Sequence, residues 1–290
     1  MMPARDRFLT ANRLRLHLLE WGAGSRVVLC LHGVQEHAHA WDFVAPRIVA
    51  AGYHVFALDW RGHGDSDWVG AGGYYHFADY TADLAAVVRD LGGRVALVGH
   101  SMGGNAALTY AGTEPERVAA LVSIEGLGPP DAEPESAPER FRTWLDDLER
   151  AERRGRRELT LAEGASRLRE RFPLWSEATA SHMAELGTVE RGGKRVWKFD
   201  PLHQTRSPQP FYLRQAQAFW RRISCPVLYV EGTSSFISIQ APEIAARASM
   251  VRALRVTIDG AGHHPHLEKP HELAKAVIDF LDAALRQEGD

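Results

Sequence analysis

The hydrophobic and polar positions of this chain alternate in a way that predicts a parallel sheet wrapped by helices. Short, almost continuous apolar runs indicate central strands, because a parallel strand is covered on both faces. An earlier segment, residues 14–18, alternates leucine with polar residues and predicts an edge strand with one wet face. The apolar runs are residues 27–31, 55–58, 95–98, 121–124, 227–230 and 254–258. Helical apolar spacing is found between them, at residues 41–51, 75–91 and 271–285.

The alternation stops between residues 126 and 222, and this stretch predicts a separate, mainly helical insertion. Gly128-Pro129-Pro130-Asp131 interrupts the chain at its start. We expect a core domain made of residues 1–125 and 223–290, with residues 126–222 forming a lid over the strand ends. The elements expected in the insertion are two Arg- and Glu-rich helices with solvated faces, residues 137–157 and 161–172, and a hairpin over residues 188–199.

A serine between glycines follows one of the predicted strands directly. The sequence is Gly99-His100-Ser101-Met102-Gly103, and residues 105–111 predict a helix behind it. At such a strand-to-helix turn the backbone is strained and the serine hydroxyl stands clear of the sheet. Glycines are needed there because strand and helix approach too closely for a Cβ. The pentapeptide also occurs in ordinary turns, but in this context it indicates that Ser101 is a nucleophile.

Serine is a weak nucleophile at its ordinary pKa and needs a base to take its proton. The chain has 14 histidines, so position must select among them. His263 comes after the last predicted strand, at the edge of the sheet where the serine turn should lie. We therefore predict that His263 is the base. His264 and His266 are close enough in sequence to compete, and we expect them to support the site or to face solvent.

A carboxylate is needed to hold the imidazole tautomer and to stabilise the imidazolium. Two glutamates stand at strand ends, Glu125 after residues 121–124 and Glu231 after residues 227–230. No acid stands in the turn beyond Gly232, and the chain order Ser, Glu, His is known for sites built on a serine turn of this type. We favour Glu125 and keep Glu231 as the alternative; the structural alternative for Glu125 is a turn or cap residue.

The negative charge that develops on a carbonyl oxygen must be held by fixed donors, usually two backbone N–H groups. Met102 follows the serine and supplies the first. The strand over residues 27–31 ends in His32-Gly33, where glycine lets the chain turn back over the site. We predict that the N–H of Val34 is the second donor.

With these residues assembled, the chain resembles the α/β-hydrolase superfamily over nearly its whole length. The stretch Gly262-His263 with Glu268 and Pro270 is similar to the family's G-H-x-x-x-x-E-x-P stretch, which favours His263 over its neighbours. The resemblance implies the α/β-hydrolase fold, a mostly parallel central sheet flanked by helices, with a helical lid inserted. The other matching stretches, in the family's order, are His32-Gly33, residues 58–66 and residues 99–104.

The position of the acid departs from the commonest family pattern. Members often carry it as G-x-x-D, whereas here Gly232 is followed by Ser235 at that place. Some members, including a serine-hydrolase-like branch and certain haloalkane dehalogenases, place it after the strand that follows the serine helix, where Glu125 stands. Asp59 resembles a structural loop residue of the family and is left out of the site. Two neighbouring histidines, His37 and His39, lack the further ligands of a metal centre.

The expected chemistry is acyl transfer to water through an acyl-enzyme. Epoxide hydrolases and dehalogenases of this family resemble each other in using an aspartate where Ser101 stands, so both are disfavoured. We expect a carboxylic ester, then a thioester, with carbon–carbon cleavage of a diketone as an alternative and no cofactor. The aromatic residues of the insertion favour a small to medium apolar group; they are Trp144, Phe172, Trp175, Phe211, Tyr212, Phe219 and Trp220. The missing acid after Gly232 also leaves a non-catalytic ligand-binding protein open.

Composition narrows the possible partners. The 290 residues are 45% hydrophobic and 24% charged with a net charge of −3, which gives no reason to expect nucleic acid or an anionic membrane. Residues 1–21 have no continuous apolar core, so neither a signal peptide nor an anchor is expected there. Two cysteines, Cys30 and Cys225, fit a reduced cytoplasm. We expect a cytoplasmic enzyme with a small-molecule substrate, and the oligomeric state stays open.

Overall fold

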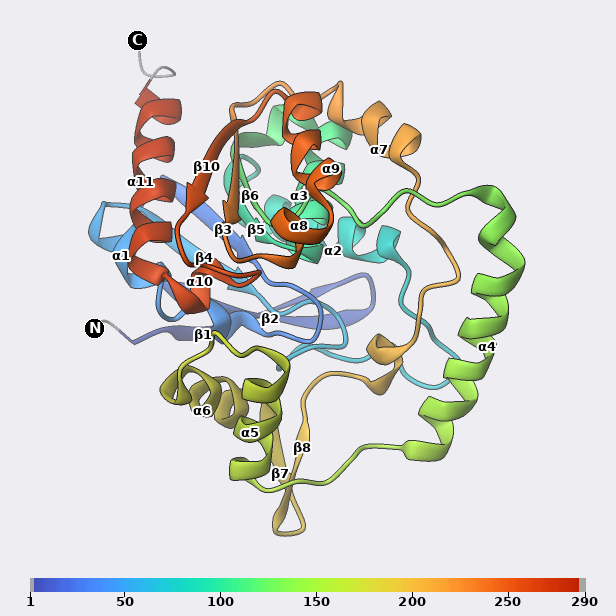
Figure 1. The fold of residues 1–290 in the computed structure, drawn as a ribbon. Coiled ribbons are helices and arrows are strands. Elements are labelled where there is room, and N and C mark those ends of the chain that lie inside the picture. Colours follow the sequence, from blue (N-terminus) through green and yellow to red (C-terminus); the bar gives the residue numbers. More distant parts are fainter. Residues whose placement is uncertain (1–2, 287–290) are drawn as a thin grey trace.

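A computed structural model describes residues 3–286, and an eight-stranded sheet runs through this part of the chain (Figure 1). The strands lie in the order β1-β2-β4-β3-β5-β6-β9-β10. The pairs β1–β2 and β2–β4 are antiparallel, and all further pairs are parallel. The mostly parallel sheet predicted from the apolar runs is thereby confirmed. The strands are β1 (Arg5–Ala11), β2 (Leu14–Trp21), β3 (Val27–Leu31), β4 (His54–Leu58), β5 (Val95–His100), β6 (Val118–Ile124), β9 (Val227–Gly232) and β10 (Leu254–Ile258).

The prediction that residues 14–18 form an edge strand is wrong. Strand β2 lies inside the sheet, between β1 and β4, and Leu16 and Leu18 are fully buried. The edge strand beside β2 is β1, which escaped the hydrophobic pattern because Arg5–Ala11 is largely polar and exposed. It is held by backbone pairing with β2 along its whole length, from Arg5 opposite Glu20 to Ala11 opposite Leu14.

Helices cover both faces of the sheet, so that successive residues of a central strand point into different cores. In β3, Leu29 and Leu31 enter one apolar core, and Val28 and Cys30 enter the other. The first core is completed by α2 (Phe77–Asp90), α3 (Met102–Thr113), α7 (Leu213–Trp220) and α9 (Pro242–Ala246), and the second by η1 (Ala38–Trp41), α1 (Ala45–Ala50) and α11 (Pro270–Arg286). The shorter elements of this part are α8 (Phe236–Gln240), α10 (Pro265–Glu268) and the 3-10 turns η2 (Pro115–Arg117) and η5 (Arg247–Val251).

Residues 126–222, called the insert below, lie between β6 and β9 and contribute no strand to the large sheet in the described chain. In Figure 1, α4 stands apart on the right, while α5, α6 and the β7–β8 hairpin lie together at the bottom. Gly192 and Gly193 both have positive φ at the hairpin turn, as the spacing predicted. The elements of the insert are η3 (Pro134–Ser136), α4 (Ala137–Arg154), α5 (Leu161–Arg171), α6 (Glu177–Leu186), β7 (Thr188–Arg191), β8 (Lys194–Trp197), η4 (Pro201–Gln204) and α7.

Apolar packing joins the insert to the sheet region at two places, among other contacts. Trp175 and Met183 form a small apolar cluster with Ala40 and Leu267, which binds α6 and the segment before it to η1 and α10. Helix α7 packs against α3, where a Cβ on Gly112 would come within 2.3 Å of the Phe219 carbonyl oxygen. In the described residues no helix has the length and apolar character needed to cross a membrane.

Candidate active site

Ser101 occupies the sharp turn between β5 and α3. Its backbone angles, φ of 49° and ψ of −112°, lie outside the regions that residues with a side chain normally adopt. Such a turn is possible because glycines allow the helix to approach the sheet. A Cβ on Gly103 would lie 2.3 Å from the Leu31 carbonyl oxygen, and one on Gly99 would lie 2.5 Å from the backbone of Gly103. The strained serine turn expected from the sequence is present.

The structure brings Ser101, His263 and Glu125 together at one edge of the sheet. The Oγ of Ser101 lies 3.2 Å from Nε2 of His263, and Nδ1 of His263 lies 3.4 Å from Oε2 of Glu125. The three residues follow β5, β10 and β6, whose carboxyl ends meet at this edge. The arrangement is that of a nucleophile, a base and an orienting carboxylate in a hydrogen-bonded chain.

The carboxylate of Glu125 is buried and held by two further donors. The N–H of Gly232 donates to Oε1 at 2.8 Å, and the hydroxyl of Ser235 donates to Oε2 at 2.6 Å. Ser235 is the residue that stands where the family's more common pattern has its acid. Here its hydroxyl donates to Glu125, a role that the sequence alone did not indicate.

The alternative acid, Glu231, contacts other partners. Its Oε1 lies 2.5 Å from the guanidinium of Arg255 and 3.3 Å from the hydroxyl of Thr257, both on the edge strand β10. No hydrogen bond or ion pair joins it to His263 within the described residues. Of the two glutamates considered, the structure brings only Glu125 to the histidine.

His263 is suited to accept a proton at neutral pH. Burial lowers the pKa of His263 below its ordinary value of 6.5; Glu125 opposes this shift, and the neighbouring His100 adds to it. The imidazole is therefore neutral near pH 7, with Nδ1–H directed at Glu125 and the free lone pair of Nε2 directed at Ser101.

Three N–H groups of the loop after β3 have acceptors. The N–H of Gly33 donates to Oε2 of Glu36, that of Gln35 to His63, and that of Glu36 to the Gly33 carbonyl. In residues 3–286, the N–H of Val34 has no such acceptor. The N–H of Met102 heads α3, where the first amides of a helix lack acceptors within it. Val34 and Met102 thus have the donor groups predicted for an oxyanion site.

A buried carboxylate surrounded by histidines lies behind His263, and sequence reasoning missed it. Oε1 of Glu36 lies 3.0 Å from Nδ1 of His100 and 3.3 Å from Nε2 of His264, and Oε2 lies 3.3 Å from Nε2 of His266. The other ring nitrogen of His100, Nε2, lies 2.7 Å from the His263 carbonyl oxygen. His100 Nε2 therefore has a hydrogen-bond acceptor, and Nδ1 lies within ion-pair distance of the Glu36 carboxylate.

The charges of this cluster follow from its burial. Burial alone would raise the pKa of Glu36 and lower that of His100, but their mutual attraction outweighs it and shifts both pKa values the other way. Burial lowers the pKa of His264 to about 3 and that of His266 to about 4, so both are neutral. Glu36, His100 and His266 have the donor atoms of a metal site, within 4.8 Å of one another. The negative charge of Glu36 is already balanced by the positive charge of His100, and His266 is neutral.

The remaining residues considered from the sequence, Asp59, His37 and His39, have hydrogen-bond partners outside the proposed site. Asp59 is buried and accepts from His17 at 2.7 Å and from the N–H of Ala38 at 2.6 Å, which fixes the turn after β4. His37 points to the Met183 carbonyl of α6, and His39 pairs with Asp42.

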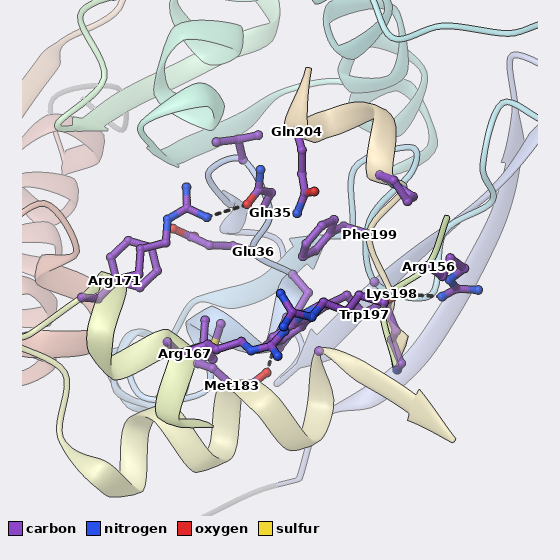
Figure 2. Close-up of a pocket in the computed structure, with 18 of the residues that line it drawn as sticks. Gln35, Glu36, Arg156, Arg167, Arg171, Met183, Trp197, Lys198, Phe199 and Gln204 are labelled. Atoms are coloured by element: carbon purple, nitrogen blue, oxygen red, sulfur yellow. Dashed lines mark hydrogen bonds between the residues drawn. The ribbon is translucent and has the colours of Figure 1, made fainter. Parts of the chain in front are cut away.

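A cavity of about 590 Å³ lies between the loop after β3 and the insert (Figure 2). Val34 and Gln35 line it on the core side, and Phe172 and Trp175 on the insert side. The rings of Phe172 and Trp175 also pack against His264, the residue after His263. The cavity therefore adjoins both the free N–H of Val34 and the histidine loop. Its volume is typical of a small-molecule site.

Known proteins show the same architecture. The family model for the alpha/beta hydrolase fold matches residues 26–270. An epoxide hydrolase A of Mycobacterium tuberculosis is 28% identical over 324 residues, which cover 95% of this chain and 97% of that protein. An esterase of the same organism is 29% identical over 286 residues, covering 91% and 85%. The solved thioesterase domain from the curacin biosynthetic pathway is 31% identical with a TM-score of 0.84, covering 96% of this chain and all of that one.

The similarity spans the sheet, the serine turn and the histidine loop rather than one short motif. Relatives named as esterase and hydrolase match nine tenths or more of this chain. The resemblance inferred from four short motifs is confirmed: the chain belongs to the α/β-hydrolase family and is a hydrolase.

Proposed function

We propose that this protein hydrolyses a carboxylic ester through an acyl-enzyme, with Ser101 as nucleophile, His263 as base and Glu125 as the orienting acid. The observation that carries the proposal is the continuous chain of contacts from Ser101 Oγ through His263 to the buried Glu125 carboxylate. A serine hydroxyl becomes a competent nucleophile when a positioned neutral imidazole can take its proton.

In the first half of the reaction, Ser101 Oγ attacks the ester carbonyl carbon while its proton passes to Nε2 of His263. The imidazolium that forms is stabilised by Glu125, and the N–H groups of Val34 and Met102 donate to the carbonyl oxygen as it becomes negative. Collapse of the tetrahedral intermediate breaks the bond to the alcohol oxygen, which takes the proton from Nε2 and leaves. Ser101 then carries the acyl group.

In the second half, water replaces the alcohol. His263 takes a proton from the water as its oxygen attacks the acyl carbon, and the same donors hold the oxyanion again. Collapse expels Ser101 Oγ, which recovers its proton from Nε2, and the carboxylic acid is released. A thioester follows the same path with a thiol as the leaving group.

The nature of the nucleophile decides between the chemistries that relatives of this chain suggest. One matched relative is an epoxide hydrolase, and another is an esterase. A serine alkoxide that opened an epoxide would form an ether, which water does not hydrolyse under mild conditions, whereas an acyl-serine ester turns over. The cavity of about 590 Å³ with Phe172 and Trp175 in its wall supports a small to medium substrate with an apolar part.

A fluorophosphonate probe tests the proposal, because it modifies serines that an adjacent base has activated. The native protein and Ser101→Ala are treated alike, and the modified residue is identified by mass spectrometry. We expect stoichiometric modification at Ser101, none in the variant, and loss of p-nitrophenyl ester turnover in the variant. An unmodified, folded native protein would support a ligand-binding protein instead. Retention of most ester turnover by Ser101→Ala would also refute the proposal, and a ring-cleavage diketone tested alongside distinguishes carbon–carbon hydrolysis.

A further inference from the structure

Basic side chains gather around the cavity beside the proposed active site. Among the described residues that line it, Glu36 is the single acid, and its carboxylate contacts the buried histidines. Most of the basic residues come from α5 and the segment just before it, and Figure 2 shows several of them around the same space as Gln35 and Phe199. The basic residues of the wall are Arg156, Arg157, Arg167, Arg171 and Lys198.

Two of these cations already have partners in the protein. Lys198 pairs with Asp65 at 2.8 Å, and a guanidinium nitrogen of Arg156 donates to the Trp197 carbonyl at 2.5 Å. Arg171 uses one nitrogen, Nη1, to donate to Oε1 of Gln35 at 2.7 Å. The remaining nitrogens of Arg171 are left for another acceptor.

Arg167 is the cation best placed to receive a ligand. It is half-buried in the wall, and no hydrogen bond or ion pair holds its guanidinium within the part of the chain that the structure describes. The acids of its own helix are occupied elsewhere: Glu163 accepts from the N–H of Thr160 at 2.7 Å and Glu170 from the hydroxyl of Ser166 at 3.2 Å. Glu163, one turn earlier, attracts Arg167 electrostatically but forms no ion pair with it in the described residues, so the partly desolvated guanidinium is left to bind an anion of a ligand directly.

Two of the three arginines of α5 line the cavity, and the cavity adjoins the proposed oxyanion loop. Arg167 and Arg171 are four residues apart, so they lie on one face of the helix. Gln35, which Arg171 contacts, follows Val34, whose free N–H is the proposed oxyanion donor. Guanidinium groups match the geometry of carboxylate and phosphate oxygens.

We propose that the substrate of this hydrolase carries an anionic group, a carboxylate or a phosphate, which Arg167 and Arg171 bind while the ester carbonyl lies at Ser101. The inference rests on the proposed function and deepens it. It replaces a purely apolar substrate with one whose apolar part packs on the aromatic wall and whose charged end reaches α5.

The test compares esters that differ only in the charge of one end. One is 4-nitrophenyl hydrogen glutarate, with a terminal carboxylate, and the other is the neutral 4-nitrophenyl pentanoate. We expect kcat/KM for the charged ester to be higher by about tenfold or more at low salt, mainly through KM, and the advantage to shrink as sodium chloride screens the charges. Inhibition by glutarate compared with inorganic phosphate then distinguishes the two kinds of anion.

Variants of one helix provide the matched control. Arg167→Gln should lower kcat/KM for the charged ester about tenfold and leave the neutral ester within about twofold. Arg169→Gln removes the same charge from the same helix, but Arg169 is exposed and does not line the cavity. It should leave both esters unchanged. Arg171→Gln should behave as Arg167→Gln does, with an added loss on both esters because the contact with Gln35 is lost.

The outcomes separate this inference from the proposed function. Equal rates for both esters, or equal effects of Arg167→Gln and Arg169→Gln, would overturn the anion site while the neutral ester still reports the hydrolase. If neither ester is hydrolysed, calorimetric titration of Ser101→Ala with glutarate decides independently. Saturable binding that Arg167→Gln weakens supports the anion site, and absence of binding refutes it.

Discussion

The replacement Glu125→Gln tests the proposed acid with almost no change of shape. The carboxylate is surrounded by three donors: the N–H of Gly232, the hydroxyl of Ser235 and Nδ1–H of His263. A glutamine can keep its carbonyl on Gly232. Its amide nitrogen then takes the place of Oε2, donates to Ser235, which can turn to accept, and directs its second hydrogen at Nδ1 of His263.

An amide donor facing Nδ1 favours the imidazole tautomer that carries its proton on Nε2. That tautomer cannot accept the proton of Ser101, and the negative charge that stabilises the imidazolium is also gone. We expect kcat for a p-nitrophenyl ester to fall by about 10³- to 10⁴-fold, which corresponds to about 4–5.5 kcal/mol of transition-state stabilisation. The unfolding free energy should change far less, because two of the three contacts can be kept.

Glu231→Gln is the control, since it removes the same charge from the neighbouring strand. Glu231 pairs with Arg255 and, within residues 3–286, forms no hydrogen bond or ion pair with His263, so this variant should keep kcat within about twofold. Steady-state rates at pH 7–8 and denaturant unfolding of both variants are the measurements. A Glu125→Gln protein within tenfold of the parent, or a Glu231→Gln protein that loses as much, would refute the assignment.

Three further predictions concern the base, the serine turn and the oxyanion loop. Because burial lowers the pKa of His263, kcat/KM should hold as pH falls to 6.5 and be lost below it; an acid limb above 6.5 would contradict this. Gly103→Ala places a Cβ 2.3 Å from the Leu31 carbonyl oxygen and should cost about 3 kcal/mol in denaturant unfolding; an unchanged midpoint would show that the turn relaxes. In Gln35→Asn the new residue tolerates the φ of 64° but is too short to reach Arg171, so kcat should fall about tenfold at little cost in stability. An unchanged kcat would show that the contact between Arg171 and Gln35 does not help to position the oxyanion loop.

Much of the fold could be predicted because buried parallel strands leave a strong signal. Runs such as 27–31 and 95–98 are apolar at every position since helices cover both faces, and the strands have these bounds or extend them by a few residues. The signal fails where a strand is largely polar and exposed, as in β1, and where a helix is short and mixed in composition, as in α6.

The candidate site was predictable to the extent that its residues are tied to strand ends. Ser101, Glu125 and His263 each follow an apolar run, and parallel strands collect their carboxyl ends at one edge, so proximity could be inferred without coordinates. The choice between Glu125 and Glu231 could not be made in this way. Both stand at the end of a strand, and which face each side chain takes depends on the backbone after the strand.

Sequence by itself therefore determined the family, the sheet and the identity of the candidate nucleophile and base, because these depend on local patterns and on the order of elements along the chain. Tertiary structure decided the rest: that Glu125 reaches His263, that Ser235 supports it, that Glu36 is buried among histidines 64 or more residues away in sequence, and that Arg167 and Arg171 face a cavity while Arg169 does not. The physical reason is that these hydrogen bonds and ion pairs depend on the direction and burial of side chains that are distant in sequence. Both depend on the folded backbone and cannot be read from the local sequence pattern.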